Sequence, residues 1–204
     1  MKVKKPGSML GWGLILALAA NLIIAVTAAR AAGPMEDVQS LITEVQTILK
    51  THTQKSERLN LVEKLTAKHL DFREMAQRCL GSTWSSLGEG QKSEFVQLFG
   101  ELLKAHYANH LDDFAKTTVN YQDAVCNGDS AEVRIAVIRP NDKIPVSFRL
   151  LQKPQGWMIY DLNIEGVSMV SNFRTQFSRA MQVGSYQGLL ARLKAHLADC
   201  KGQG

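Results

Sequence analysis

The hydrophobic period of the chain changes twice, and this change restricts the possible folds more than any other feature. From Asp37 to about Asp113 apolar residues recur every three or four positions, which predicts amphipathic helices. From Thr117 to Ile164 they alternate with polar residues, which predicts strands, and after Gly166 the helical period returns. Because helices and strands form separate runs, we expect an α+β fold, in which helices cover one face of a curved antiparallel sheet of about four strands.

The boundaries of these elements follow from capping and turn residues. Asp71 is a predicted N-cap with Glu74 completing a capping box, and Gly81 ends that helix. The predicted helices cover residues 37–50, 54–69, 71–81, about 89–113, 167–181 and 186–198, and the predicted strands are TVNYQDAV, AEVRIAVIR, IPVSFRLLQ and WMIYDLNI. The short links CNGDS, PNDK and KPQG predict tight turns, so neighbouring strands should run antiparallel.

The alternation also predicts which side chains face the helices. Val133, Ile135 and Val137 share one face of their strand, and the next strand repeats the pattern with Val146, Phe148 and Leu150. The last strand offers two inward sets, either Tyr160 and Leu162 or Trp157 and Ile159.

The first 31 residues have the pattern of a secretory signal peptide. Lys2, Lys4 and Lys5 precede an apolar run from Met9 to Val26, and the small residues of Ala29-Arg30-Ala31 form a cleavage site. The competing interpretation is an uncleaved membrane anchor. We expect cleavage, which leaves residues 32–204 as a single domain.

Charge argues against nucleic-acid binding, and cysteine content argues against a disulfide-based fold. Removal of residues 1–31 takes away four of the 24 basic residues and no acidic one, which leaves 20 basic residues against 19 acidic ones. A basic surface for nucleic acid is therefore not expected. Three cysteines without a CxxC pair do not predict a disulfide framework, although one disulfide plus a free thiol stays open, and Cys79 on an apolar stripe is expected to be a buried small side chain.

The sequence contains no convincing catalytic or metal-binding motif. His106 and His110 have the spacing of two metal ligands, but Tyr107 stands where a zinc protease needs glutamate. Asp161 and Glu165 bracket a strand-to-helix junction, where capping of the helix is the expected role. We therefore expect no catalytic residues, no metal and no cofactor.

Two arginines lie among apolar residues. Arg149 is in a predicted strand, and Arg174 lies between Phe173 and Phe177 in a predicted helix. Each fits a surface arginine with a partly covered stem, and each also fits a partner for phosphate or carboxylate at the rim of an apolar cavity.

Several segments resemble one known family, in the same order along nearly all of residues 32–204. IPVSFRLLQKPQGWMIYDLNIEGVSMVSNFRTQF resembles the signature of the MlaC family of periplasmic phospholipid-binding proteins, also called toluene-tolerance proteins. LDFREMAQRCLGSTW, EGQKSEFVQLFGELLKAHY and GSYQGLLARLKAHL are similar to other family segments. Cys79 and Gly88 depart from the family pattern.

The resemblance implies a periplasmic lipid carrier and not an enzyme. It implies a monomer that holds acyl chains in an apolar cavity between sheet and helices. It also implies that this monomer exchanges phospholipid between an outer-membrane lipoprotein complex and an inner-membrane ABC-transporter complex. This exchange would maintain the lipid asymmetry of the outer membrane. A hopanoid-associated branch of the family stays open, as do a small-molecule enzyme with an apolar pocket and a structural adaptor with a filled core. The expected lipid-binding residues are Val133, Ile135, Val146, Phe148, Tyr160, Leu162, Val170, Phe173 and Phe177, with Arg149 and Arg174 at the head-group rim.

Overall fold

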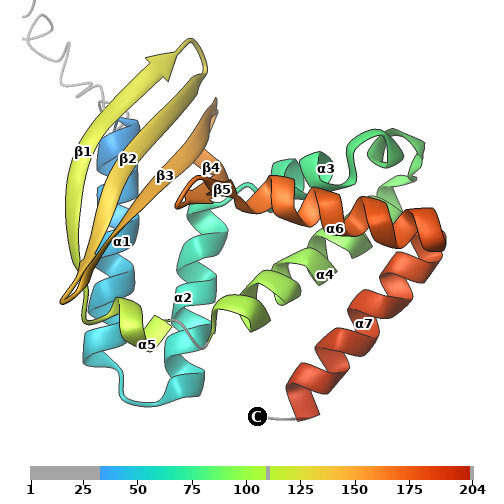
Figure 1. Ribbon diagram of the computed structural model, residues 1–204, viewed down its shortest axis with the longest axis horizontal. Coiled ribbons are helices and arrows are strands. Elements are labelled where there is room, and N and C mark those ends of the chain that lie inside the picture. The colour runs from blue at the N-terminus through green and yellow to red at the C-terminus, as the bar shows by residue number, and fades with distance from the viewer. Residues whose placement is uncertain (1–32, 109–110, 203–204) are drawn as a thin grey trace, which may run out of the picture. The chain divides into compact units, whose positions relative to one another are not determined.

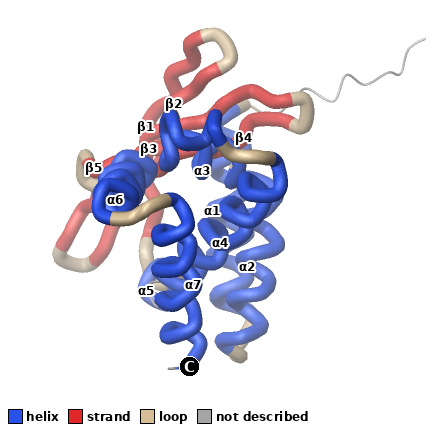
Figure 2. The backbone as a smooth tube through the Cα atoms, turned by 90° about the vertical axis from the view of Figure 1, so that its right-hand side faces the viewer, coloured by secondary structure: helices blue, strands red, loops and turns tan. Residues whose placement is uncertain are grey.

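The computed structural model describes residues 33–108 and 111–202, so the predicted signal peptide lies outside the described residues. Within these two ranges, no helix is both long enough and apolar enough to cross a membrane. Figure 2 shows that helices and strands keep to separate regions, as the sequence pattern predicts.

Four helical elements come first, close to their predicted bounds. They are α1 (Pro34–Thr51), α2 (Lys55–His69), α3 (Phe72–Leu80) and the short 3₁₀ helix η1 (Gly81–Ser86). The carboxylate of Asp71 caps α3 by accepting the backbone N–H of Glu74 at 2.9 Å. The predicted reciprocal bond from Glu74 is wrong, because the N–H of Asp71 donates to the carbonyl of Ile159 and the Glu74 carboxylate pairs with Arg78.

The predicted long helix is shorter than expected. It ends at Tyr107 as α4 (Glu89–Tyr107), and a separate four-residue helix, α5 (Leu111–Phe114), follows. Phe95, Phe99 and Leu103 of α4 belong to the hydrophobic cluster of the helices, whereas Leu111 and Phe114 pack against the sheet cluster.

The strands form one antiparallel meander with the order β1-β2-β3-β4-β5 (Figure 1). They are β1 (Thr118–Asn127), β2 (Ser130–Arg139), β3 (Asp142–Lys153), β4 (Gly156–Ile164) and β5 (Val167–Ser168). The four long strands match the prediction. The two-residue β5 was not predicted, because two residues are too few to display an alternating pattern.

A β-bulge in β4 resolves the two inward sets that the sequence left open. Leu150 pairs with Ile159 and Phe148 pairs with Leu162, and the register shifts between these two pairs. Ile159 and Leu162 therefore both belong to or pack against the sheet cluster, although they are three positions apart and regular alternation would place them on opposite faces. Tyr160 is the additional residue, and its ring lies 4.1 Å beneath the guanidinium of Arg78 on α3.

Two long helices complete the chain, α6 (Met169–Val183) and α7 (Tyr186–Gly202). In Figure 1, α6 runs above α4, and α7 turns back beside them. Phe173 and Phe177 of α6 meet Phe99 of α4 edge to face, with ring centroids 5.5 and 6.3 Å apart. Such pairs add about 0.5–1.5 kcal/mol each beyond the burial of their area.

The buried side chains form two hydrophobic clusters. The sheet cluster joins α1 and α2 to the inner face of β2 and β3, and the helix cluster joins α3, α4, α6 and α7. Leu70 and Leu162 pack against both clusters. An apolar pocket, described below, lies where these two clusters meet.

Candidate functional site

An apolar pocket of about 450 Å³, called here the sheet pocket, lies between the sheet and helices α1, α2 and α4. Ile42, Val45, Leu59, Val62 and Leu103 contribute its helical walls. The sheet contributes the apolar side chains Ile135, Val137, Ile144, Val146, Phe148, Leu162 and Ile164. This volume is within the range of roughly 300–1,000 Å³ that is typical of ligand sites.

Helical and strand periodicities explain why these walls are apolar. Ile42 and Val45 are three residues apart on α1, as are Leu59 and Val62 on α2, so each pair faces the same side. Gly100 on α4 also lines the pocket, and apart from its chain neighbours and the backbone of its own helix no atom lies within 4 Å of the position where its Cβ would be. The missing side chain therefore leaves space in this wall.

Polar side chains are few in the sheet pocket. Glu63 of α2 and Lys104 of α4 line it and form an ion pair with each other. Thr66 and Arg139 are two further polar residues of the lining. Because Lys104 is paired with Glu63, it supplies no uncompensated charge to a ligand.

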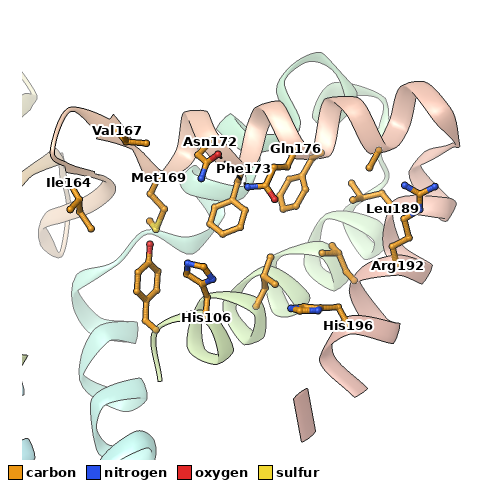
Figure 3. Close-up of a pocket in the computed structure, with 15 residues that line it drawn as sticks. His106, Ile164, Val167, Met169, Asn172, Phe173, Gln176, Leu189, Arg192 and His196 are labelled. Carbon is orange, nitrogen blue, oxygen red and sulfur yellow. Dashed lines mark hydrogen bonds between the residues drawn. The ribbon is translucent and has the colours of Figure 1, made fainter. Parts of the chain in front are cut away.

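A second pocket of about 430 Å³, called here the helix pocket, lies between α4, α6 and α7 (Figure 3). Its apolar side chains include Phe173, Phe177, Leu189 and Leu193. Its polar lining consists of His106, Tyr107, Asn172, Gln176, Arg192 and His196. It is therefore amphipathic, whereas the sheet pocket is almost entirely apolar.

The two pockets share three lining residues, Tyr107, Ile164 and Met169. Helix α4 runs between the pockets, because Gly100, Leu103 and Lys104 line one and Leu102 and His106 line the other. Tyr107 is at the last turn of α4 and is common to both. Burial raises the pKa of its phenol, and the negative charge of Asp161 raises it further, so the hydroxyl is protonated at neutral pH.

The predicted lipid-binding residues divide between these pockets and the packed interior. Ile135, Val146, Phe148 and Leu162 line the sheet pocket, and Phe173 and Phe177 line the helix pocket. Val133 and Val170 are buried and line neither pocket. Tyr160 also lines neither, because the bulge directs it towards α3.

The structure shows the surroundings of the two arginines that the sequence predicts at the head-group rim. Arg149 Nη1 is 3.4 Å from Oδ2 of Asp161, on the face of the sheet opposite Phe148. Arg174 lies beside Gly81, whose Cβ position would be 3.2 Å from the guanidinium. Neither is among the described residues that line the sheet pocket or the helix pocket, and their role at the rim stays a prediction. Arg139 and Arg192 do line the pockets, but nothing in the sequence distinguishes them from other surface arginines. Gly100 is a further lining residue that the sequence could have indicated, because a glycine inside an apolar helical stripe leaves space in the wall.

The candidates for chemistry have structural roles. Asp161 is buried and accepts hydrogen bonds from the Ser168 hydroxyl at 2.6 Å and the Val170 N–H at 3.0 Å, which confirms its predicted capping role. Ser168 in turn accepts the N–H of Ser171 as the N-cap of α6. His110 lies outside the described residues, and the described part of the chain holds no group of three or more metal-ligating side chains.

The cysteines are all unpaired, and one of them is inaccessible. Cys79, Cys126 and Cys200 are free thiols. Cys79 is fully buried, as its position on an apolar stripe predicts. Burial, reinforced by the charge of Asp161 and opposed by that of Arg174, raises its pKa to about 12. It is therefore an inert packing residue and not a nucleophile.

Comparison with known proteins identifies the family. The profile of the MlaC protein family matches residues 39–195. The intermembrane phospholipid transport system binding protein MlaC of Haemophilus influenzae is 28% identical over 101 residues, which is 47% of each chain, so the alignment spans about half the length of that relative.

A solved structure shares the fold. It is a phospholipid-binding protein from Ralstonia solanacearum, determined in complex with a phospholipid, with a TM-score of 0.77 and 24% identity over 83% of this chain and 99% of that one. This structure shows the fold, and the profile match over most of the chain establishes that the chain belongs to the MlaC family, as the resemblance of its segments predicts.

Proposed function

We propose that this protein is a periplasmic lipid carrier that binds phospholipid acyl chains in the sheet pocket. It exchanges this lipid between an outer-membrane lipoprotein complex and an inner-membrane ABC-transporter complex. The observation that carries the proposal is the apolar pocket of about 450 Å³ at the seam between sheet and helices. The names of the Haemophilus influenzae and Ralstonia solanacearum relatives support phospholipid as the ligand.

The lining of the sheet pocket suits acyl chains. Ile135, Val146, Phe148 and Leu162 are the predicted residues that line it, and we propose that they contact the chains. Burial of a methylene group contributes about 0.8 kcal/mol, so two long acyl chains contribute roughly 20 kcal/mol or more before other costs. Water therefore cannot compete with the pocket for the lipid.

Reversible exchange follows from the same energetics. A bilayer offers acyl chains the same gain as an apolar pocket, so the free-energy difference between carrier and membrane is small. Transfer can then run in either direction, according to which partner complex receives the lipid.

The proposal is tested by filling the sheet pocket. Val146 lines the pocket, so Val146→Trp should occupy the space of the lipid and reduce lipid recovered with the purified protein, with little loss of stability. Val125→Trp is a matched control, because Val125 is 50% exposed on β1 and does not line the pocket. Lipid occupancy is measured by native mass spectrometry and stability by thermal unfolding.

A third variant separates a pocket from a filled core. Val133 is fully buried and does not line the pocket, so Val133→Trp should overpack the interior and cost roughly 1–3 kcal/mol or more. If Val146→Trp behaves like Val133→Trp and leaves lipid occupancy unchanged, the sheet pocket is part of an ordinary core and the proposed function is wrong.

A further inference from the structure

Among the residues that the structure describes, no aspartate or glutamate lines the helix pocket. Its ionisable side chains are all basic or phenolic. They are His106, Tyr107, Arg192 and His196, and the amides of Asn172 and Gln176 complete the polar lining. The two amides are adjacent, because Nε2 of Gln176 donates to Oδ1 of Asn172 at 3.3 Å. Guanidinium, imidazole and amide groups all supply the N–H donors that a phosphate oxygen accepts.

Arg192 is the fixed positive charge of this pocket. It is exposed on α7 and forms no ion pair with any residue that the structure describes. Figure 3 shows its side chain at the α7 end of the helix pocket, with Gln176 on α6 and His196 on the same helix as Arg192. The guanidinium is therefore available to an anion.

The helix pocket also adjoins the apolar space of the sheet pocket. Tyr107, Ile164 and Met169 line both, and Phe173 and Phe177 continue an apolar surface from Met169 towards α7. Figure 3 places Ile164 and Met169 at one end of the helix pocket and Arg192 at the other. A ligand with an anionic end and a long apolar end matches this order of side chains.

We propose that the helix pocket binds the phosphate of the lipid head group through Arg192, while the acyl chain passes Phe173, Tyr107 and Met169 into the sheet pocket. This inference rests on the proposed function and adds the position of the head group. Arg139 is the other arginine of a pocket lining, but Glu63 and Lys104 of the sheet pocket pair with each other, so that pocket offers a phosphate fewer N–H donors than the imidazoles and amides around Arg192 do.

The test compares two probes with the same chain. Delipidated protein is offered palmitoyl lysophosphatidic acid and monopalmitoylglycerol, which lacks the phosphate, and native mass spectrometry measures the bound ratio. The wild-type protein should prefer the phosphate-bearing probe. Arg192→Gln should reduce this preference about twofold to fivefold, the range that an exposed ion pair of up to about 1 kcal/mol allows.

Matched controls identify the source of the preference. Arg179→Gln removes an exposed arginine of α6 that lines neither pocket, so the preference should stay unchanged. Inorganic phosphate alone should not bind saturably, because it has no chain to bury. Saturable binding of inorganic phosphate would overturn the inference in favour of a simple anion site.

The remaining outcomes separate this inference from the proposed function. If both probes bind and only Arg139→Gln, Arg149→Gln or Arg174→Gln changes the preference, the head group lies elsewhere, and the inference is wrong while the carrier function holds. Equal binding of both probes, unaffected by Arg192→Gln, also overturns the inference alone. If neither probe binds, the proposed function itself fails.

Discussion

The backbone N–H of Val170 donates a 3.0 Å hydrogen bond to Oδ1 of the buried Asp161, which ties the first turn of α6 to the last long strand of the sheet. The hydroxyl of Ser168 donates to Oδ2 of the same carboxylate at 2.6 Å, and Arg149 approaches it at 3.4 Å. Met169, which lines both pockets, lies between Ser168 and Val170 in the chain. The Asp161 carboxylate therefore positions the residue at which the two pockets meet.

Replacement of this carboxylate by an amide should destabilise the protein. Asp161→Asn removes a charged acceptor that serves two buried or half-buried donors, so we expect a loss of roughly 1–3 kcal/mol in the free energy of unfolding. Glu165→Gln is the matched control, because Glu165 is exposed at the same junction, and it should change stability by less than about 0.5 kcal/mol. Urea unfolding followed by circular dichroism measures both, and equal effects would show that Asp161 does not support the junction.

The three thiols should differ in their reaction with maleimide. Cys126 and Cys200 are exposed and should be labelled in the native protein at neutral pH. Cys79 is fully buried, and its pKa is raised to about 12, so it should react only after unfolding. Mass spectrometry before and after denaturation counts the labels, and a third label on native protein would contradict the packing around α3.

Alkaline pH should destabilise the protein partly through Cys79. Its pKa rises from 9.0 in the unfolded chain to about 12 in the folded protein, so the unfolded chain releases the proton first. This contribution to stability is complete below about pH 9 and decreases as pH rises towards 12. Cys79→Ala should therefore lose stability less steeply over this range, measured as the slope of unfolding free energy against pH. Burial also raises the pKa values of Tyr107 and Tyr186, so these tyrosines add the same loss of stability at alkaline pH to the wild-type protein and to Cys79→Ala. An identical slope in the two proteins would therefore contradict the role of Cys79.

Two glycines should respond oppositely to the same substitution. Gly81 has φ 58° and ψ −129°, a conformation that strains any other residue, so Gly81→Ala should cost roughly 1–3 kcal/mol. Gly100 lies inside α4, and no side chain or backbone of another element lies within 4 Å of its Cβ position, so Gly100→Ala should stabilise the helix by about 0.5–1 kcal/mol. Thermal unfolding compares them, and a destabilised Gly100→Ala would mean that the wall of the sheet pocket has no room for a methyl group.

The secreted protein should begin near Ala32. The basic start, the apolar run and the Ala29-Arg30-Ala31 site predict cleavage of residues 1–31. The intact mass of protein from a periplasmic extract measures the start. Retention of Met1 in a membrane fraction would instead support the uncleaved anchor.

The local pattern of residues predicted the secondary structure well, because burial imposes periods of 3.6 on helices and 2 on strands. The four long strands, their antiparallel turns, the Asp71 cap of α3 and the inward set Val133, Ile135 and Val137 all follow from spacing within a few residues. The family also followed from the sequence, because its segments lie in the same order along the chain.

Tertiary packing alone decided the site. The bulge beside Tyr160 depends on pairing with Arg149 and Leu150 of another strand, so alternation along β4 could not show which side chains face the pocket. Likewise, Val133 and Val146 both belong to inward faces, but Val146 lines open space and Val133 packs against neighbours. Periodicity reports which face of an element is buried, whereas the space left between elements depends on how distant segments such as α2, α4 and β3 come together.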